Sequence, residues 1–310
     1  MTYQLVPPDD ASIRRTIAEH LPHLAHEAIE SLGAGWAFWA YRVGDKVLRF
    51  PRDAEFTHTL AVEAAVMSEL APTLPLPVAV IDVHEGGPGG LPFTGHRFVP
   101  GVPVVDLPRQ LAPGAGSVLG EFIRAMHSFP VERAAALGLP KLSPPQRQAA
   151  RRSFFSDEVV RRIFSLLTNE GREHVRATFR AFLENPSHFD WQPVVTHCDI
   201  DARNVLADPE TGELTGVIDW GDLSIADPAG DFIDAQNGGL ARFGLSGQLN
   251  DLLKAYGITR AELETMQPRC DFYKYCWPLH EIIYGLNSHD DDVVQKGIEA
   301  LEEKVHAPGP

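Results

Sequence analysis

The first third of the chain changes from helical to strand-type spacing of its apolar residues. Between residues 11 and 32 apolar side chains recur every three or four positions, which predicts one amphipathic helix. These side chains are Ile13, Ile17, Leu21, Leu24, Ile29 and Leu32. The segment 35–51, "GWAFWAYRVGDKVLRFP", instead carries aromatic and β-branched residues on both sides of a Gly-Asp pair. That pattern is typical of a hairpin of two strands.

The next apolar segments complete a strand-rich front part. A helix is predicted over 58–71, where it stops before the breaker "PTLPLP". Strands are predicted at 78–83 and 95–101, with the Gly-rich turn "EGGPGGLP" between them.

After residue 101 the pattern becomes mainly helical. Helices are predicted over 116–130 and across most of 146–185 and 247–304. Short strands interrupt them between 194 and 227, at "PVVTH", "NVLAD" and "LTGVIDW". We therefore predict an α+β fold with two lobes, a small N-terminal lobe built on a sheet (1–97) and a larger, mostly helical C-terminal lobe (98–310).

Composition and charge narrow the class of protein. The 310 residues are 44% apolar, enough for two lobes. No apolar run reaches the roughly eighteen residues of a membrane span, and the first residues lack the apolar region of a signal peptide, so we expect a cytoplasmic protein. The cysteines match neither a disulfide framework nor a zinc pattern. They are Cys198, Cys270 and Cys276.

The net charge of −15 argues against a nucleic-acid partner. An acidic protein attracts cations, either divalent metals or a polycationic small molecule. The plainer alternative is that the excess charge only keeps the protein in solution.

The stretch "VVTHCDIDARNVLAD" (194–208) holds the most informative polar residues. His197, Asp199 and Asn204 form an H-x-D-x-x-x-x-N pattern, and Asp219 follows a short apolar strand in "GVIDWGD". The turn "DPETGE" between two strands would bring Asn204 and Asp219 to neighbouring strand ends, where their oxygens suit Mg²⁺. Asp199 would lie close enough to orient or deprotonate a hydroxyl group, as phosphoryl transfer requires.

A structural explanation of the same stretch is an acidic hairpin with a capping Asp and a buried His. It accounts for the H-x-D pattern alone, but the strand-borne Asp219 at the right distance favours phosphoryl transfer. We expect His197 to brace the backbone near Asp219 and not to react.

The front part would supply the nucleotide site. Gly33 and Gly35 precede a strand as in a phosphate-covering loop, but the third glycine of such loops is missing and a plain turn fits equally well. On the strand "KVLRFP", Arg49 is expected to hold phosphates and to pair with Glu63 of the next helix. An exposed ion pair of little energetic consequence is the alternative.

Two further predictions concern this part of the chain. Lys46 is a second candidate for the phosphates, but it is expected on the opposite side of the strand. Backbone groups of Arg97, Phe98 and Val99, just before a Pro-Gly turn, are expected to hold the purine edge of ATP or GTP.

These segments together resemble the aminoglycoside phosphotransferase family, which also includes macrolide kinases and relatives such as choline kinases. The resemblance spans roughly residues 30 to 290 and is most specific in "VIDWGD…DPAGDF", which is most similar to 2″-type aminoglycoside kinases and macrolide kinases. The other matching segments are "VLRFPRD", "AVEAAVMSEL", "HRFVPG", "LGEFIRAMHSFP", "THCDIDARNVLAD" and "WPLHEIIYGL".

The resemblance implies a bilobal, protein-kinase-like fold and transfer of the γ-phosphate of ATP or GTP to a hydroxyl group. By position, Asp199 would be the catalytic base, and Asn204 and Asp219 the Mg²⁺ ligands. Arg49 and Glu63 would be the phosphate-anchoring pair. The chain departs from many members in having Cys198 where they have Gly. It also has Arg49 where many aminoglycoside kinases have Lys, which leaves the substrate subclass open.

Local charge favours a cationic acceptor. Residues 186–235 contain eleven carboxylates and one basic residue, Arg203, so a polycationic aminoglycoside would be attracted there. The candidate contacts to substrate ammonium groups are Asp201, Asp231, Asp234, Glu281 and Asp290.

Other acceptors remain open. A macrolide would need aromatic walls, for which Tyr273, Trp277 and Tyr284 are available, although their helical spacing is more typical of a core. A kinase of a cellular amino alcohol or sugar is another possibility. A non-catalytic nucleotide-binding protein is disfavoured, because it would not need Asp199 beside Asn204 and Asp219. We expect a monomer.

Overall fold

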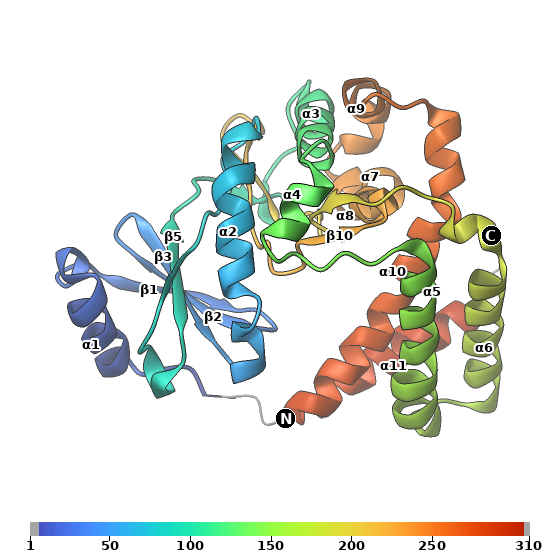
Figure 1. Ribbon diagram of the computed structural model, residues 1–310, viewed down its shortest axis with the longest axis horizontal. Coiled ribbons are helices and arrows are strands. Elements are labelled where there is room, and N and C mark those ends of the chain that lie inside the picture. Colours follow the sequence, from blue (N-terminus) through green and yellow to red (C-terminus); the bar gives the residue numbers. More distant parts are fainter. Residues whose placement is uncertain (1–5, 307–310) are drawn as a thin grey trace.

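The computed structural model describes residues 6–306, and it has two lobes (Figure 1). The N-terminal lobe is a five-stranded antiparallel sheet in the order β1-β2-β3-β5-β4. Helix α1 (Asp10–His20) packs its apolar side chains on this sheet, next to Tyr41, Leu48 and Phe93. The strands are β1 Ile29–Ala34, β2 Phe38–Val43, β3 Lys46–Pro51, β4 Asp82–His84 and β5 Phe93–Arg97.

The single helix predicted over 11–32 is wrong beyond His20. Helix α1 ends there, and a short 3₁₀ turn follows at Pro22–Leu24. Proline disfavours the helical conformation of the residue before it, and Leu21 has φ −136°. Ile29 and Leu32 therefore belong to strand β1, and the sheet has one strand more than the spacing predicts.

The remaining predictions for this lobe agree in kind but differ in their limits. The hairpin over 35–51 is formed by β2 and β3, and the helix over 58–71 is α2 (Leu60–Leu70). The strand predicted at 78–83 is reduced to β4 and a single bridge between Val78 and Val217.

The C-terminal lobe contains two small sheets. Strand β7 (Val194–Thr196) pairs with β10 (Ser224–Ala226), and β8 (Val205–Ala207) lies between β6 (Val102–Pro103) and β9 (Leu214–Val217). These strands include all three segments predicted between 194 and 227, and they confirm the hairpin at "DPETGE".

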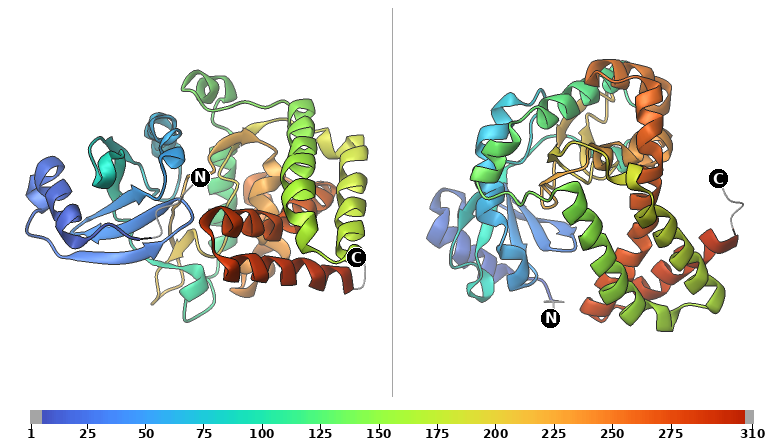
Figure 2. Two further views of the ribbon diagram at one scale, coloured as in Figure 1. Left: turned by 90° about the horizontal axis from the view of Figure 1, so that it is seen from below. Right: turned by 45° about the vertical axis from the view of Figure 1, so that its right-hand side comes forward.

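Helices form the rest of this lobe (Figure 2). A π-helical segment, η6 (Phe154–Ile163), continues α5. Helix α10 is the longest of the described helices and has Pro268 and Pro278 inside it. The helices are α3 Ala115–His127, α4 Val131–Ala136, α5 Pro144–Ser153, α6 Asn169–Glu184, α7 Ile233–Asn237, α8 Gly239–Arg242, α9 Leu249–Tyr256, α10 Arg260–Ser288 and α11 Asp291–His306. Within residues 6–306, none of the helices combines the length and the apolar character needed to cross a membrane.

The largest core joins the two lobes. Val66, Met67 and Leu70 of α2 pack in the same cluster as Phe122 of α3 and Trp220. Helix α2 therefore lies between the sheet and the C-terminal lobe, as Figure 1 shows. The apolar residues of α2 thus pack against residues on the other side of the predicted lobe boundary at 97/98. That boundary stays a prediction.

The segment 98–101 connects β5 to β6 and lies against β9. Gly101 has φ +120°, and a Cβ there would lie 2.2 Å from Thr215 Oγ1, so only glycine fits. A second core, between η6, α6 and α10, contains Phe179, Phe182 and Phe272 and fixes the outer helices to α10.

Candidate active site

A strained turn begins the loop between β7 and β8. Cys198 has φ +65°, which is uncommon for any residue except glycine. The backbone N–H groups of His197 and Cys198 donate to the two carboxylate oxygens of Asp231, at 3.3 and 2.7 Å. This left-handed backbone explains why glycine would suit the position of Cys198, whose buried thiol has its pKa raised to about 12 by desolvation.

His197 connects the loop to the strand that precedes Asp219. Its ring is fully buried, 4.6 Å from the ring of Trp220. Nδ1 accepts from the N–H of Asp199 at 3.2 Å, and Nε2 lies 3.0 Å from the carbonyl of Ile218. A carbonyl only accepts, so Nε2 carries the proton and the ring is neutral. His197 thus braces the backbone beside Asp219, as predicted.

Asp199 is held by the amide of Asn204. The Nδ2 group of Asn204 donates to Oδ2 of Asp199 at 2.7 Å and to its carbonyl at 3.0 Å. Burial, and then the negative charge of Asp201, raise the pKa of Asp199 to about 6. The carboxylate is therefore mostly ionised at neutral pH, yet basic enough to accept a proton from a hydroxyl group.

Asn204 and Asp219 lie at the ends of paired strands, as predicted. Val205 faces Val217 across β8 and β9, and the N–H of Ile218 donates to the carbonyl of Asn204 at 2.9 Å. The amide nitrogen of Asn204 is committed to Asp199, which turns its oxygen away from that carboxylate. Asp219 has φ +63° and a side chain that is 58% exposed.

These two side chains offer oxygen ligands of the kind that Mg²⁺ takes in nucleotide sites. Among residues 6–306, no three His, Cys, Asp or Glu side chains form a complete metal cage. An open site still suits Mg²⁺, because this ion keeps waters and is shared with substrate phosphates. The residues therefore fit the predicted ion.

Asp222 is a further carboxylate that the sequence analysis missed. Desolvation raises its pKa, and the charge of Asp219 raises it further. It also contributes to the raised pKa of Asp199. Asp222 thus repels both Asp199 and Asp219, and a cation would relieve that repulsion. The signal was present in the sequence, as the last residue of "GVIDWGD".

Arg49 and Glu63 form a buried pair between β3 and α2. Their side chains are 3.4 Å apart and only 9% and 5% exposed, so the alternative of an exposed ion pair is wrong. Burial raises the pKa of Glu63, and Arg49 partly opposes this. The guanidinium also lies 4.3 Å from the ring of Phe38 and 3.9 Å from Asp219. Arg49 is therefore held next to the candidate Mg²⁺ ligand.

Lys46 is on the other side, 3.8 Å from Asp82. This placement agrees with the expectation that Lys46 and Arg49 face apart.

Two backbone groups of the segment predicted to hold a purine already form hydrogen bonds within the protein. The N–H of Phe98 donates to the carbonyl of Asp45 at 2.7 Å, and the carbonyl of Arg97 lies 2.9 Å from Nδ1 of His96. Burial lowers the pKa of His96 to about 4, so the neutral ring donates to that carbonyl. The N–H of Phe98 is therefore not available to a purine, and binding of a purine edge by the other backbone groups of this segment stays a prediction. Val99, with its side chain buried, remains the candidate in this segment.

Two predicted substrate contacts are committed elsewhere. Asp231 is 2% exposed and accepts from the loop backbone and, at 2.9 Å, from Nε2 of His127. Asp201 is 6% exposed, forms an ion pair with Arg203 and accepts from the N–H of Asn204 at 3.2 Å. Both carboxylates hold the loop together, which leaves neither free for a substrate ammonium group, contrary to the prediction.

The other predicted contacts differ in access. Asp234 is buried, accepts from the N–H of Gly239 at 2.9 Å, and has a raised pKa caused mainly by burial. Glu281 is partly exposed on α10. Asp290 is exposed at the start of α11, where it accepts from the N–H of Val293 at 3.1 Å as a helix cap.

The aromatic residues of α10 divide between core and surface. The hydroxyl of Tyr273 donates to buried Asp227 at 2.7 Å, and Arg269 pairs with the same carboxylate at 2.7 Å, so Tyr273 is structural. Trp277 is 36% exposed. Tyr284 stacks on Trp36, whose side chain is 50% exposed.

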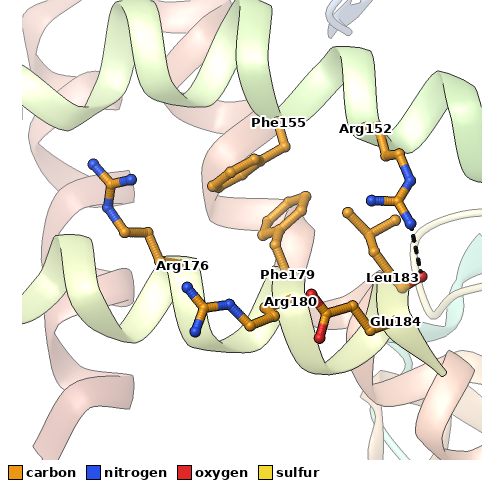
Figure 3. Close-up of a pocket in the computed structure, with 7 residues that line it drawn as sticks. All are labelled: Arg152, Phe155, Arg176, Phe179, Arg180, Leu183 and Glu184. Atoms are coloured by element: carbon orange, nitrogen blue, oxygen red, sulfur yellow. Dashed lines mark hydrogen bonds between the residues drawn. The ribbon is translucent and has the colours of Figure 1, made fainter.

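A cavity of about 280 Å³ lies between α5, η6 and α6, away from these residues (Figure 3). Its floor is the stacked pair Phe155 and Phe179, with ring centroids 4.8 Å apart. Arginines surround it, and it holds none of the predicted catalytic or metal residues. The lining residues are Arg152, Phe155, Arg176, Phe179, Arg180, Leu183 and Glu184.

The sheet lobe carries a buried Arg–Glu pair, and the C-terminal lobe carries Asp199, Asn204 and Asp219 next to it. This combination defines a kinase-like phosphotransferase. A model of the phosphotransferase enzyme family matches residues 28–268, and the chain belongs to this family. The match confirms the predicted family and class of enzyme.

Solved structures share this fold over nearly the whole chain. An aminoglycoside 2'-phosphotransferase-IIIa in complex with GDP has a TM-score of 0.79 at 23% identity, covering 96% of this chain and 99% of the other. A macrolide 2'-phosphotransferase from Brachybacterium faecium has a TM-score of 0.72 at 22% identity, with coverage of 96% and 99%. APH(2")-IIa in a ternary complex with streptomycin and ATP has a TM-score of 0.70 at 19% identity, with coverage of 96% and 97%. They confirm the bilobal fold.

Proposed function

We propose that this enzyme transfers the γ-phosphate of ATP or GTP to a hydroxyl group of an antibiotic, with an aminoglycoside as the first candidate acceptor. The observation that carries this proposal is the hydrogen bond from Asn204 to Asp199, whose pKa is raised to about 6, at the end of the strand pair that leads to Asp219. This arrangement combines a base with oxygen ligands for Mg²⁺.

In the proposed reaction Asp199 accepts the proton of the acceptor hydroxyl. The oxygen of that hydroxyl forms a bond to the γ-phosphorus, and the bond from that phosphorus to the β–γ bridging oxygen breaks. Asn204 orients the carboxylate of Asp199 through its amide group. Arg49, fixed by Glu63 and Phe38, holds the phosphates with its guanidinium.

Mg²⁺ bound through the oxygens of Asn204 and Asp219 would neutralise phosphate charge. Asp222 adds a third carboxylate to this neighbourhood and strengthens its attraction for the cation.

An aminoglycoside is favoured by the acidic excess of residues 186–235 and by the similarity in fold to aminoglycoside phosphotransferases. Asp234, whose Oδ1 has no hydrogen-bond partner among the described residues, and Glu281, which is partly exposed, are the proposed contacts to its ammonium groups. Asp290, which caps α11, is a weaker choice. We further propose a monomer, because the site is assembled from one chain.

A macrolide is the second candidate acceptor. The exposed rings of Trp36 and Trp277 could contact its apolar surface, and the similarity to a macrolide 2'-phosphotransferase agrees with this alternative.

A screen of acceptors tests the proposal. The purified enzyme is incubated with Mg²⁺ and either ATP or GTP, and nucleotide release is followed with aminoglycosides, macrolides and small amino alcohols. Mass spectrometry then identifies the phosphorylated product. We expect transfer to an aminoglycoside hydroxyl, with KM rising as salt screens the acidic site. Turnover of a small metabolite alone would contradict the assignment of an antibiotic as acceptor.

A further inference from the structure

The loop between β1 and β2 touches helix α10 of the other lobe. The ring of Trp36 stacks on Tyr284, with centroids 4.7 Å apart and planes 16° from parallel. Arg52, which follows β3, donates from Nη1 to the hydroxyl of Tyr284, 232 positions away, and to the carbonyl of Gly35 at 3.0 Å. We call Trp36, Arg52 and Tyr284 the interlobe clasp.

Arg52 is held firmly within this contact. It is 8% exposed, and its guanidinium lies 4.9 Å from the ring of Trp39 and 5.7 Å from that of Tyr284. Its Nε has no hydrogen-bond partner among residues 6–306, and the two bonds from Nη1 and the aromatic faces compensate for burying the charge.

The stack, in contrast, lies at the surface. Trp36 remains 50% exposed while it contacts Tyr284. An aromatic pair of this kind is a weak interaction, so thermal motion can open it. Gly33, with φ +101° at an irregularity of the β1–β2 pairing, lies in β1 close to the start of the loop.

The clasp connects the two sides of the proposed reaction. On the nucleotide side, the N–H of Arg52 donates to the carbonyl of Ala37 at 2.8 Å, and the next residue, Phe38, lies against Arg49. On the acceptor side, Glu281 is three residues before Tyr284 on α10, and residues at that spacing share a helix face. Figure 1 shows α10 running back towards the N-terminal lobe.

We propose that the interlobe clasp is a positioning device that holds the β1–β2 loop closed over the nucleotide during transfer and limits attack by water. This inference rests on the proposed function. When the clasp opens, a water oxygen bonds to the γ-phosphorus, the bond to the β–γ bridging oxygen breaks, and the water proton passes to Asp199. The products are then inorganic phosphate and the nucleoside diphosphate.

The test compares Trp36→Ala with Trp36→Phe and with Leu32→Ala. Leu32 is an exposed residue of β1 (46%) and serves as the matched control. Two quantities are measured: the fraction of nucleotide hydrolysed instead of transferred, and the dissociation rate of the Mg-nucleotide without acceptor. Trp36→Ala should raise both by about two- to tenfold, the factor expected for a lost aromatic stack. Trp36→Phe keeps a ring and should stay near the wild type, as should Leu32→Ala.

A second variant, Tyr284→Phe, keeps the stack and removes the hydroxyl that accepts from Arg52. It should also raise the dissociation rate, because the buried guanidinium of Arg52 loses one of the two partners of its Nη1. Equal dissociation rates for Trp36→Ala, Leu32→Ala and the wild type would overturn the clasp. If the wild type phosphorylates no acceptor, the proposed function fails, but the dissociation rate still decides whether the clasp exists.

Discussion

Individual residues of the candidate site adopt costly states that their neighbours maintain. Cys198 and Asp219 have positive φ values of 65° and 63°. Asp199 and Glu63 are carboxylates whose pKa burial raises. Such strain costs on the order of 1–3 kcal/mol for each backbone outlier and concentrates at functional sites. These residues lie in both the proposed nucleotide site and the proposed acceptor site, which agrees with a functional role for the strain.

The pKa of Asp199 predicts the pH dependence of activity. The base works only when ionised, so kcat/KM of the free enzyme should fall as the pH drops below about 6. A pH–rate profile at low acceptor concentration measures this fall in kcat/KM, and a second profile with saturating acceptor and Mg-nucleotide measures the pH dependence of kcat. An acid limb near pH 4, the ordinary range of Asp, would show that burial does not tune this carboxylate.

The same shift has a consequence for stability. The folded-state pKa of Asp199 is about 6, above the ordinary value of 3.8, so its ionised form disfavours folding at pH above both values. Asp199→Asn should therefore raise the melting temperature at pH 7, and the gain should disappear as the pH falls below 4. Thermal melts at the two pH values give this difference.

At the scale of elements, helix α2 couples the proposed nucleotide site to the main core. Its apolar face packs with α3, while Glu63 on the same helix holds Arg49. A displacement of the helix would therefore move Arg49, which is proposed to hold the phosphates. Glu69 of α2 offers a comparison, since it pairs with Arg133 at the surface.

Glu63→Gln should raise KM for the nucleotide more than it lowers kcat, because Arg49 loses its charged partner but keeps Phe38 and Asp219. Glu69→Gln should change neither constant, since exposed pairs contribute about 0–1 kcal/mol to stability. Steady-state kinetics with varied nucleotide measure both. Equal effects of the two substitutions would remove Glu63 from the nucleotide site.

The order of elements could largely be predicted from spacing, whereas the ends and partners of elements could not. Ile29 and Leu32 fit a helical stripe, but Pro22 ends the helix before reaching them. The pairing of β8 with β9 followed from the turn between them, so the placement of Asn204 and Asp219 was accessible to sequence reasoning.

The spacing of residues along the chain could not predict which carboxylates are buried. Asp201 and Asp231 look like free charges in the sequence, yet tertiary contacts bury both and commit them to the loop backbone. The hydrogen bond from Phe98 to Asp45 joins residues that are far apart in the sequence, so no local sequence pattern could predict it. Charge counts along the chain therefore overestimate the number of carboxylates open to a substrate.

For the whole molecule, the fold brings two distant parts of the chain to one site. The sheet lobe supplies Arg49, the helical lobe supplies Asp199, Asn204 and Asp219, and α2 and the interlobe clasp connect them. Several carboxylates form hydrogen bonds within the protein, but the net charge of −15 still attracts cations. A cationic acceptor should therefore bind more weakly as the salt concentration rises.

The central claim is that Asp199 is the base for phosphoryl transfer from a nucleoside triphosphate to a hydroxyl group. The most direct test measures the rate at which the acceptor gains a phosphoryl group with the wild type and with Asp199→Ala, alongside Mg-nucleotide affinity. We expect Asp199→Ala to lose roughly 10²–10⁴-fold in the rate of transfer, with nearly unchanged affinity for the Mg-nucleotide. Transfer by Asp199→Ala at the wild-type rate would contradict it.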